Sequence, residues 1–261
     1  MNCSLIITTY NWPEALRLVL SSINDQSILP NEIIIADDGS RESTRKLIEE
    51  YKDILSIPTI HSWQEDYGFR LSKSRNRAIA LASYEYIIVV DGDMVLHKDF
   101  VKDHKRFAQE GIYVQGSRVL LQEEFSNNLF EQKKFIQPTF FSKEVKNKIN
   151  LLRLPLLSII FSYFKNQNIN RVRGCNFSLF KKDIIKVNGF NEEFKKWGKE
   201  DSEFVQRLFN SGIYRKNLKF SGIQYHLYHK EGFADNCNID ILNNTIKKKI
   251  KRCSNGIKKY L

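Results

Sequence analysis

The first 120 residues alternate short, apolar, β-branched runs with segments of helical period, and this alternation is the strongest constraint on the fold. The strand-like runs occupy residues 4–9, 32–36, 56–61 and 86–90, and the helical segments occupy residues 11–23, 41–51 and 71–82. Such alternation predicts a parallel sheet with helices on both faces. Ligands bind to sheets of this kind beyond the C-terminal ends of the strands.

Two acidic turns follow strand-like runs and are therefore expected at that ligand-binding rim. Asp37 and Asp38 follow the second run, and Asp91 and Asp93 follow the fourth, with Gly92 between them. Carboxylates at a strand end can accept hydrogen bonds from a base or a ribose. Two carboxylates one residue apart can also share a divalent cation, and hard oxygen ligands suit Mg²⁺ or Mn²⁺.

Three later segments carry further chemistry. Residues 68–77 are basic and enter a helix, an arrangement that suits phosphate. Residues 197–201, Trp-Gly-Lys-Glu-Asp, open another helix, where a carboxylate can act as a general base and the tryptophan can face a sugar ring. Residues 225–229 contain two histidines, and a late histidine can complete a metal site begun by carboxylates.

Each of these motifs also has a purely structural explanation. An acidic turn can simply end a strand, with Asn11 and Ser40 capping the helices that follow. A basic helix face can be merely solvated, and acidic residues in a first turn complement the helix dipole. Taken one at a time, the motifs leave both interpretations open.

The chain divides into four parts, predicted to form a single domain. Residues 1–120 form the strand-helix half and residues 172–244 a second ordered half. Residues 121–171 break the pattern and are expected to be an insertion on the acceptor side or facing a membrane, helical near residues 151–164. Residues 245–261 form a basic tail.

Composition narrows the class of protein. Lys and Arg number 41 against 30 Asp and Glu, which gives a net charge of +11 and suits an anionic partner. The four scattered cysteines suggest free thiols in a reducing compartment. The N-terminus lacks the pattern of a signal peptide, and no apolar run is long enough for a membrane span. These features predict a cytoplasmic protein.

The order of the motifs resembles the family 2 glycosyltransferases of the GT-A fold. The resemblance rests on the runs SLIITTYN, EIIIADDGS and DGD, with Thr8 where the family usually has proline. The block containing GCNFSLFKK, NGF and WGKED resembles the C-terminal region of β-1,4-galactosyltransferases and bacterial chondroitin-type polymerases, with Lys199 where that pattern has a second glycine. Together the resemblances cover residues 4–120 and 172–230.

This resemblance implies an α/β, Rossmann-like GT-A fold with a mixed, mainly parallel sheet flanked by helices. It also implies inverting, Mn²⁺- or Mg²⁺-dependent transfer of a hexose or N-acetylhexosamine from a UDP-sugar. The residues implied to bind the nucleotide sugar are Thr9, Tyr10, Asn11, Asp37, Asp38, Arg75, Asn76, Asp91 and Gly92. The resemblance implies Asp93 and His226 as metal ligands, with His229 near the diphosphate. It implies Asp201 as the catalytic base, Glu200 as a ligand for substrate hydroxyls, and Trp197 and Gly198 at the acceptor.

The implied acceptor is a glycan or a lipid-linked glycan of bacterial surface polysaccharide or lipooligosaccharide synthesis. The basic tail and residues 151–164 suggest peripheral contact with an anionic membrane, at the inner face of the plasma membrane. No nucleic-acid partner is expected, because acidic turns at the rim would repel phosphate without a metal. Two alternatives stay open: a basic nucleic-acid-binding protein, and a GT-A protein that binds a nucleotide sugar without transferring it.

Overall fold

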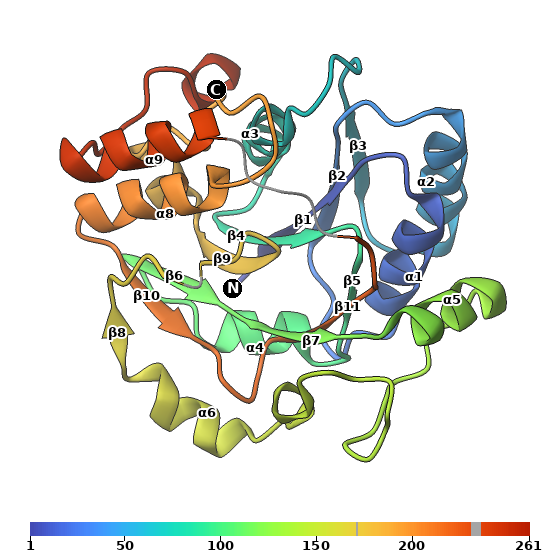
Figure 1. Cartoon of the computed structure of the whole chain (residues 1–261). Helices are drawn as coiled ribbons and strands as arrows, with labels where there is room; N and C mark the ends of the chain where they lie inside the picture. The colour runs from blue at the N-terminus through green and yellow to red at the C-terminus, as the bar shows by residue number, and fades with distance from the viewer. Residues whose placement is uncertain (171, 231–235) are drawn as a thin grey trace.

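The computed structural model describes residues 1–170, 172–230 and 236–261, and within them the strands form an eight-stranded and a three-stranded sheet (Figure 1). The larger sheet has the order β3-β2-β1-β4-β9-β6-β10-β8, and the smaller sheet has the order β5-β11-β7. The strands are β1 (Cys3–Thr9), β2 (Glu32–Asp37), β3 (Thr59–Trp63), β4 (Tyr86–Asp91), β5 (Met94–Leu96), β6 (Ile112–Gln115), β7 (Ser117–Leu120), β8 (Lys165–Asn166), β9 (Asn176–Phe180), β10 (Tyr214–Asn217) and β11 (Ile223–His226).

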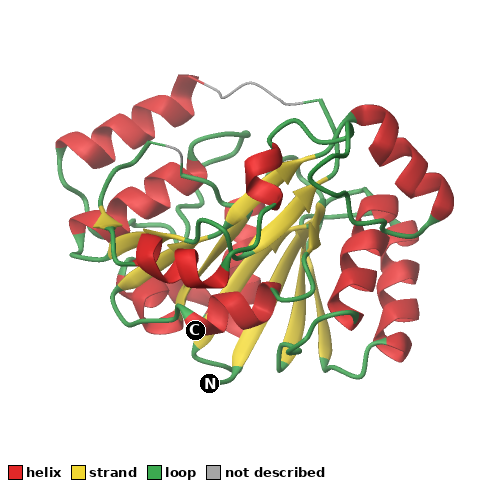
Figure 2. Ribbon diagram, turned by 90° about the horizontal axis from the view of Figure 1, so that it is seen from below, coloured by secondary structure: helices red, strands yellow, loops and turns green. Residues whose placement is uncertain are grey.

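Helices cover both faces of the larger sheet (Figure 2). They are α1 (Pro13–Asn24), α2 (Glu42–Ile54), α3 (Leu71–Leu81), α4 (Phe100–Arg106), α5 (Glu123–Gln132), α6 (Pro155–Ser162), α7 (Lys181–Lys186), α8 (Glu200–Asn210) and α9 (Asn236–Lys247), with 3₁₀ helices η1 (Lys148–Leu151) and η2 (Ile257–Tyr260). Alternate side chains of a strand face opposite sides. Leu5 and Ile7 of β1 therefore join one core with α1 and α2, while Ile6 joins the other with α3 and α8.

The predicted mixed, mainly parallel sheet flanked by helices is confirmed. Strands β3, β2, β1 and β4 are parallel neighbours, and β9 then runs antiparallel between β4 and β6. Because β9 comes from the second ordered half, the two halves share one sheet. The expected strands at residues 4–9, 32–36 and 86–90 are present, whereas the strand expected at 56–61 begins later, at Thr59.

The predicted helix caps are wrong, because Asn11 and Ser40 instead form hydrogen bonds between the turn after β1 and the turn after β2. Helix α1 has Trp12 at its N-cap and α2 has Arg41. The backbone N–H of Asn11 donates to Ser40 Oγ (2.9 Å), and Asn11 Oδ1 accepts from the backbone N–H of Arg41 (2.8 Å). These bonds tie the end of β1 to the end of β2.

Residues 121–171, expected to be an insertion, contribute side chains to the core of the domain. Leu121, Leu129 and Val145 lie in the same apolar core as β1 and α1. The helix expected near residues 151–164 is present as the shorter α6, which begins at Pro155. Among the described helices, none has the length and apolar character that crossing a membrane would require.

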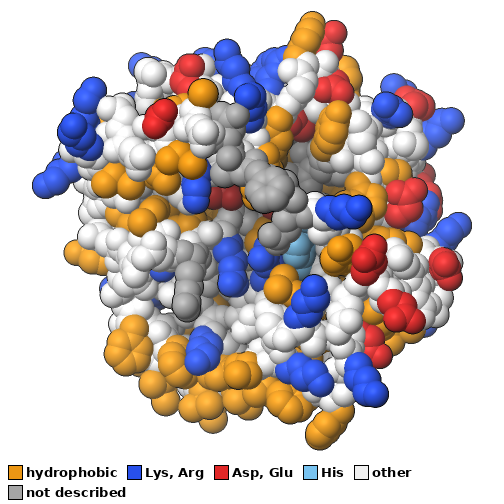
Figure 3. Space-filling model, viewed as in Figure 1, with side chains coloured by type: hydrophobic (Ala, Val, Ile, Leu, Met, Phe, Trp, Pro, Cys, Tyr) orange, Lys and Arg blue, Asp and Glu red, His pale blue; other side chains and the backbone are white. Residues whose placement is uncertain are grey.

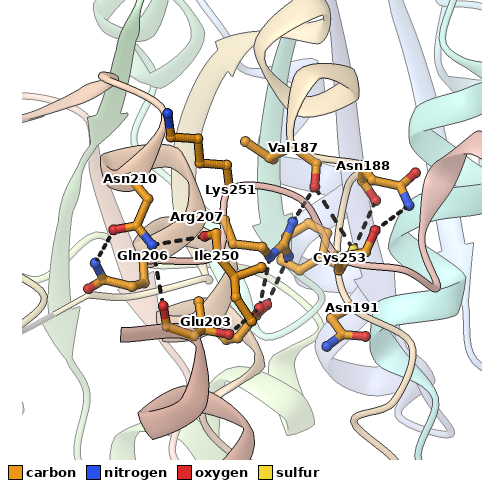
Figure 4. A network of polar contacts seen from close by, with 12 residues as sticks. Val187, Asn188, Asn191, Glu203, Gln206, Arg207, Asn210, Ile250, Lys251 and Cys253 are labelled. Carbon is orange, nitrogen blue, oxygen red and sulfur yellow. Dashed lines mark hydrogen bonds and ion pairs between the residues drawn. The ribbon is translucent and has the colours of Figure 1, made fainter. Parts of the chain in front are cut away.

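The basic tail packs against the domain through its apolar and polar side chains. Ile257 is buried in the core beside α3, and Cys253 Sγ lies 3.4 Å from the carbonyl oxygen of Asn188. A buried ion pair in α8, Glu203 with Arg207, lies beneath this segment, and Thr245 Oγ1 donates to Glu203 Oε1 (3.0 Å; Figure 4). Most of the tail's lysines stay on the surface.

Replacing Arg207 by Met is expected to lower the free energy of unfolding by about 3–5 kcal/mol, because Glu203 would remain buried without its partner. Urea unfolding followed by circular dichroism measures this loss. The double variant Glu203→Leu/Arg207→Met removes both charges and should recover most of it. Parent-like unfolding of the single variant would contradict the importance assigned to this pair.

Candidate functional site at the C-terminal edge of the sheet

The ends of three parallel strands bring the predicted acidic turns together. Thr9 at the end of β1 pairs in register with Asp37 of β2, and Thr8 pairs with Asp91 of β4. A cavity of about 280 Å³, here called the rim cavity, opens beyond these ends. The predicted residues that line it are Thr9, Tyr10, Asp38, Asp91, Gly92 and Asp93.

Asp38 is fixed at the rim cavity by two hydrogen bonds. Its carboxylate accepts from Gln64 Nε2 (2.6 Å) and from the backbone N–H of Arg70 (2.8 Å). Burial raises the pKa of this carboxyl in spite of both bonds. Tyr10 is half exposed above the cavity, where its hydroxyl donates to Asp66 Oδ2 (2.9 Å).

Three of the residues expected at the nucleotide line neither the rim cavity nor the larger cavity beside it. Asp37 is buried, with its Oδ1 accepting from the backbone N–H of Ser40 and its Oδ2 2.8 Å from His61 Nε2. Asn11 braces the turns described above. Asn76 is fully buried, donating to and accepting from the backbone of Phe190. Their side chains hold the loops that shape the site.

Arg75 lies under the site and connects two carboxylates that are far apart in the sequence. It is buried to 1% exposure, donating from Nη1 to Asp201 Oδ1 (2.6 Å) and from Nη2 to Asp91 Oδ1 (2.9 Å). Thr8 Oγ1 also donates to Asp91 Oδ1 (2.7 Å). Arg75 was expected at the ribose or diphosphate, but its guanidinium is engaged with these two carboxylates.

A larger cavity of about 470 Å³, the central cavity, lies on the other side of Asp91 and Asp93. The predicted residues that line it are Arg75, Asp91, Asp93, Trp197, Gly198, Glu200, Asp201, His226 and His229. The two cavities share Asp91 and Asp93, so the site is continuous. Trp197 is half exposed at its edge and offers a flat face to a ligand.

Glu200 and Asp201 form the first turn of α8, which begins after a sharp bend. Gly198 has φ +102° and Lys199 has φ +73°, a region that residues other than glycine seldom adopt. This conformation accounts for the second glycine that the motif usually has at Lys199. The bend lets the backbone N–H of Gly198 donate to Glu200 Oε2 (3.0 Å).

These two carboxyl groups are held in an environment that favours keeping a proton. Burial and the neighbouring Asp201 carboxylate raise the pKa of Glu200 to about 7. Burial also raises the pKa of Asp201, although Arg75 opposes the shift. A Cβ added at Gly174 would lie 2.0 Å from the Asp201 carboxyl group, so glycine there leaves the carboxylate its place.

Asp93, His226 and His229 form a compact cluster of potential metal ligands. Asp93 Oδ2 lies 3.2 Å from His226 Nε2 and 3.1 Å from His229 Nε2, and the two Nε2 atoms are 3.0 Å apart. Burial opposes ionisation of Asp93, but hydrogen bonds with the two histidines hold its pKa well below its usual range. His229, expected at the diphosphate, thus lies beside the other two ligand candidates.

The cluster fits a divalent cation. His229 Nδ1 lies 3.0 Å from the carbonyl oxygen of Lys230, so Nδ1 carries the hydrogen and Nε2 keeps a lone pair. Asp93 Oδ1 is buried without a hydrogen-bond partner among the described residues. One carboxylate and two imidazoles suit a first-row ion such as Mn²⁺ better than Mg²⁺, which prefers oxygen ligands.

Sequence reasoning missed several residues that the site uses. Gln64 follows β3 and holds Asp38, and the rule that placed functional residues at strand ends could have found it. Arg118 on β7 and Arg173 add positive charge to the central cavity, but nothing in their local sequence singled them out. Thr8 was noted only as a departure from proline, yet it holds Asp91.

Two protein-family models match the chain. The model described as glycosyl transferase family 2 matches residues 4–186, and the model described as the N-terminal domain of galactosyltransferase matches residues 156–230. The first match runs through residues 121–171, which the expected resemblance did not cover.

Curated relatives include large polysaccharide synthases. The chain is 28% identical to the chondroitin synthase of Escherichia coli over 239 residues, which is 85% of this chain and 34% of that protein. It is 29% identical to the hyaluronan synthase of Pasteurella multocida over 256 residues, which is 87% of this chain and 24% of that protein. The chain therefore spans only a quarter to a third of the length of these relatives.

Solved structures confirm the expected GT-A fold. Staphylococcus aureus TarS 1–349 in complex with UDP matches all of this chain and 68% of its own, with a TM-score of 0.66 and 16% identity. The mannosyltransferase PcManGT of Pyrobaculum calidifontis, in complex with GDP-Man and Mn²⁺, matches 89% of this chain and 58% of its own, with a TM-score of 0.58. At such low identity these likenesses concern the fold alone.

The ligand cluster makes a prediction that needs no enzymatic assay. Mn²⁺ with UDP should raise the melting temperature of the parent protein, because a ligand that binds only the folded state stabilises it. Asp93→Ala should abolish the Mn²⁺-dependent part of the shift. His229→Gln should raise the Mn²⁺ concentration needed for half of that shift about tenfold. Asp53→Asn, at an exposed position of α2, is the control. An unchanged Mn²⁺ titration in Asp93→Ala would remove the cluster as a metal site.

Proposed function

Since the chain belongs to glycosyl transferase family 2, we propose that it transfers a hexose or N-acetylhexosamine from a UDP-sugar to a hydroxyl group of a glycan. One observation carries the proposal above all. The Asp201 carboxylate, tied to Asp91 through Arg75, faces the same cavity as the Asp93–His226–His229 cluster. A general base for the acceptor hydroxyl and a metal site for the donor diphosphate would therefore lie side by side.

The rim cavity suits the nucleoside of the donor. Asp38, Thr9 and Tyr10 line this cavity and would contact the nucleobase, and Asp91 and Gly92, which also line it, would border the ribose and diphosphate. The metal ligands would be Asp93, His226 and His229. A divalent ion bound there would neutralise the negative charge that develops on the departing diphosphate.

Asp201 would act as the base on the acceptor side. Its carboxylate takes the proton of the acceptor hydroxyl as that oxygen forms a bond to the anomeric carbon, while the bond from that carbon to the diphosphate oxygen breaks. Attack from the face opposite the diphosphate inverts the configuration, so an α-linked donor yields a β-glycoside. Glu200 would hold substrate hydroxyls, and Trp197 and Gly198 would border the acceptor sugar.

The two rival functions fit the site less well. A nucleic acid in the central cavity would bring its phosphates against the carboxylates of Asp91, Asp93, Glu200 and Asp201, which would repel them. A protein that only binds the nucleotide sugar would have no use for a buried and a half-buried carboxyl group, both with raised pKa values, beside the ligand cluster. Both features favour catalysis.

We further propose that the enzyme builds bacterial surface polysaccharide or lipooligosaccharide at the inner face of the plasma membrane, with α6 in contact with the membrane. Apolar side chains gather at the lower edge of Figure 3, over α6. Leu156 and Tyr163 are 78% and 77% exposed, and Ile160 is 56% exposed. Such a surface suits the interface of a bilayer, where an acceptor on a lipid carrier would be presented.

Cations border this apolar surface, as an anionic leaflet would require. Lys219 Nζ lies 4.7 Å from the centre of the Phe161 ring, and Lys165 lies three residues beyond the end of α6. Each such cation near an anionic leaflet adds about 1 kcal/mol of attraction. The basic tail lies at the opposite end of the molecule from α6 in Figure 1, so membrane contact is assigned to α6 rather than to both segments.

Transfer activity is tested by UDP release from the four common UDP-hexoses and N-acetylhexosamines in the presence of Mn²⁺. Asp201→Asn should lower the rate about 10²–10⁴-fold, because asparagine cannot accept the proton. Donor binding, measured by thermal shift, should survive. Asp240→Asn, exposed on α9, is the matched control. If no donor is cleaved by the parent, or if Asp201→Asn retains the parent rate, the proposed mechanism fails.

The same assay has an expected pH dependence. The carboxyl pair keeps a proton below the raised pKa of Glu200, about 7, so kcat/KM should rise with pH and level off above that value. In Glu200→Gln, Asp201 loses a like-charged neighbour, and the midpoint should move to lower pH. A midpoint that stays fixed in that variant would exclude coupling between the two groups.

Membrane contact is tested by co-sedimentation with anionic and neutral liposomes. The parent should sediment with anionic liposomes, and less so at high salt, because salt screens the charges. Leu156→Ser/Ile160→Ser should reduce sedimentation at least fivefold. Ile54→Ser/Leu81→Ser removes two apolar side chains elsewhere that are 50% and 51% exposed, and it should have no effect. Equal sedimentation of both double variants would reject α6 as the contact.

A further inference from the structure

A second large cavity lies on the far side of α3 from the catalytic carboxylates. This basic cavity has a volume of about 710 Å³ and is bounded by α3, the loop before it, the loop before α8 and the C-terminal η2. The helical period divides α3 between two cavities. Leu71 and Arg75 face the central cavity, whereas Lys73 and Arg77 line the basic one.

The basic cavity has a strong excess of positive charge. Its cations are Arg70, Lys73, Arg77, Lys195 and Lys259. Glu192 is the carboxylate among its described lining residues, and its Oε2 is held by Lys259 Nζ (2.7 Å) and by the Tyr260 hydroxyl (3.1 Å). Four cations thus have no carboxylate partner among the described residues that line this cavity. Figure 3 shows Lys and Arg side chains at the top of the view, over α3 and the C-terminal end.

Aromatic side chains accompany these cations. Tyr67, Phe69, Phe194 and Tyr260 line the same cavity. Tyr67 is 65% exposed, and the guanidinium of Arg70 lies 4.5 Å from the centre of its ring. Aromatic faces provide rigid apolar area for the C–H faces of sugar rings, and neighbouring cations hold carboxylate or phosphate groups. The combination suits an anionic sugar better than a free inorganic anion.

The basic cavity is continuous with the site on two sides. Phe69 lines both the basic cavity and the rim cavity. The loop before α8 carries Phe194 and Lys195 at the basic cavity, and two residues later it carries Trp197 at the central cavity. A chain whose terminal hydroxyl lies at Asp201 can therefore run over Trp197 towards the cations.

We propose that the basic cavity binds a negatively charged sugar residue of the acceptor glycan, behind the residue that receives the new sugar. This inference rests on the proposed function, because it supposes that an acceptor lies at Asp201. The charge recognised is a uronate carboxylate or a phosphate group on the glycan. Binding there would hold the growing chain and select anionic acceptors over neutral ones.

Binding of matched oligosaccharides, measured by calorimetry at 50 and 150 mM NaCl, tests the inference. The carboxylate arm compares hexagalacturonate with its fully methyl-esterified form, and the phosphate arm compares phosphorylated mannopentaose with mannopentaose. At least one anionic probe should bind the parent tenfold or more tightly than its neutral partner, with weaker binding at the higher salt concentration. The arm that shows this preference identifies the anion.

Two double variants separate a specific site from general attraction to a basic protein. Lys73→Gln/Arg77→Gln should weaken the preferred anionic probe at least tenfold and leave its neutral partner unchanged. Arg45→Gln/Lys46→Gln removes the same charge from the exposed face of α2 and should change binding less than twofold. Equal losses in both variants, or equal binding of charged and neutral probes in both arms, would overturn the inference.

Donor cleavage without any acceptor keeps this result separate from the proposed function. Lys73 and Arg77 line neither the rim cavity nor the central cavity, so their double variant should release UDP at the parent rate. A parent that releases no UDP from any donor, with or without acceptor, contradicts the proposed function and with it the acceptor role of the cavity. Parent-like UDP release together with charge-independent binding overturns the inference alone.

Discussion

The buried guanidinium of Arg75 is the group on which the site depends. It joins Asp91, at the end of β4, to Asp201, at the start of α8. Asp91 is 16 residues and Asp201 is 126 residues from Arg75 in the sequence. With Glu200 beside them, these carboxylates would repel one another in an interior that solvates charge poorly. One arginine that donates to both offsets that repulsion and fixes the position of α8 relative to the end of β4.

The architecture around Arg75 supports the same connection. Strand β9 comes from the second half of the chain and pairs with β4 in the sheet. The same half of the chain supplies α8, which begins at the rim where β1, β2 and β4 end. The buried Glu203–Arg207 pair then fixes α8 against the segment that leads to the C-terminus. The basic tail therefore supports α8, while its lysines remain exposed to solvent.

The sequence was sufficient to predict the secondary structure that follows from the local spacing of apolar residues. Strands β1, β2 and β4, helices α1 to α3 and the acidic turns follow from apolar runs with breaks between them. The roles of Arg75 and Asn76 could not be predicted in this way, because burial and partners more than 100 residues away decide them. His229 illustrates the same limit. On a continuous strand, His226 and His229 would point to opposite faces. Instead β11 ends at His226, and the chain that follows brings both rings to Asp93.

The central cavity and the basic cavity differ in charge within a protein whose net charge is +11. Asp91, Asp93, Glu200 and Asp201 line the central cavity, where in the proposed reaction they would stabilise a metal ion, a proton and the positive charge that develops on the sugar. Four basic side chains also line the central cavity, namely Arg75, Arg118, Arg173 and Lys199. On the other face of α3, the described residues that line the basic cavity include five cations and one carboxylate. Because α3 supplies Arg75 to one side and Lys73 and Arg77 to the other, this one helix both balances the carboxylates of the proposed active site and lines the cavity proposed to bind the acceptor glycan.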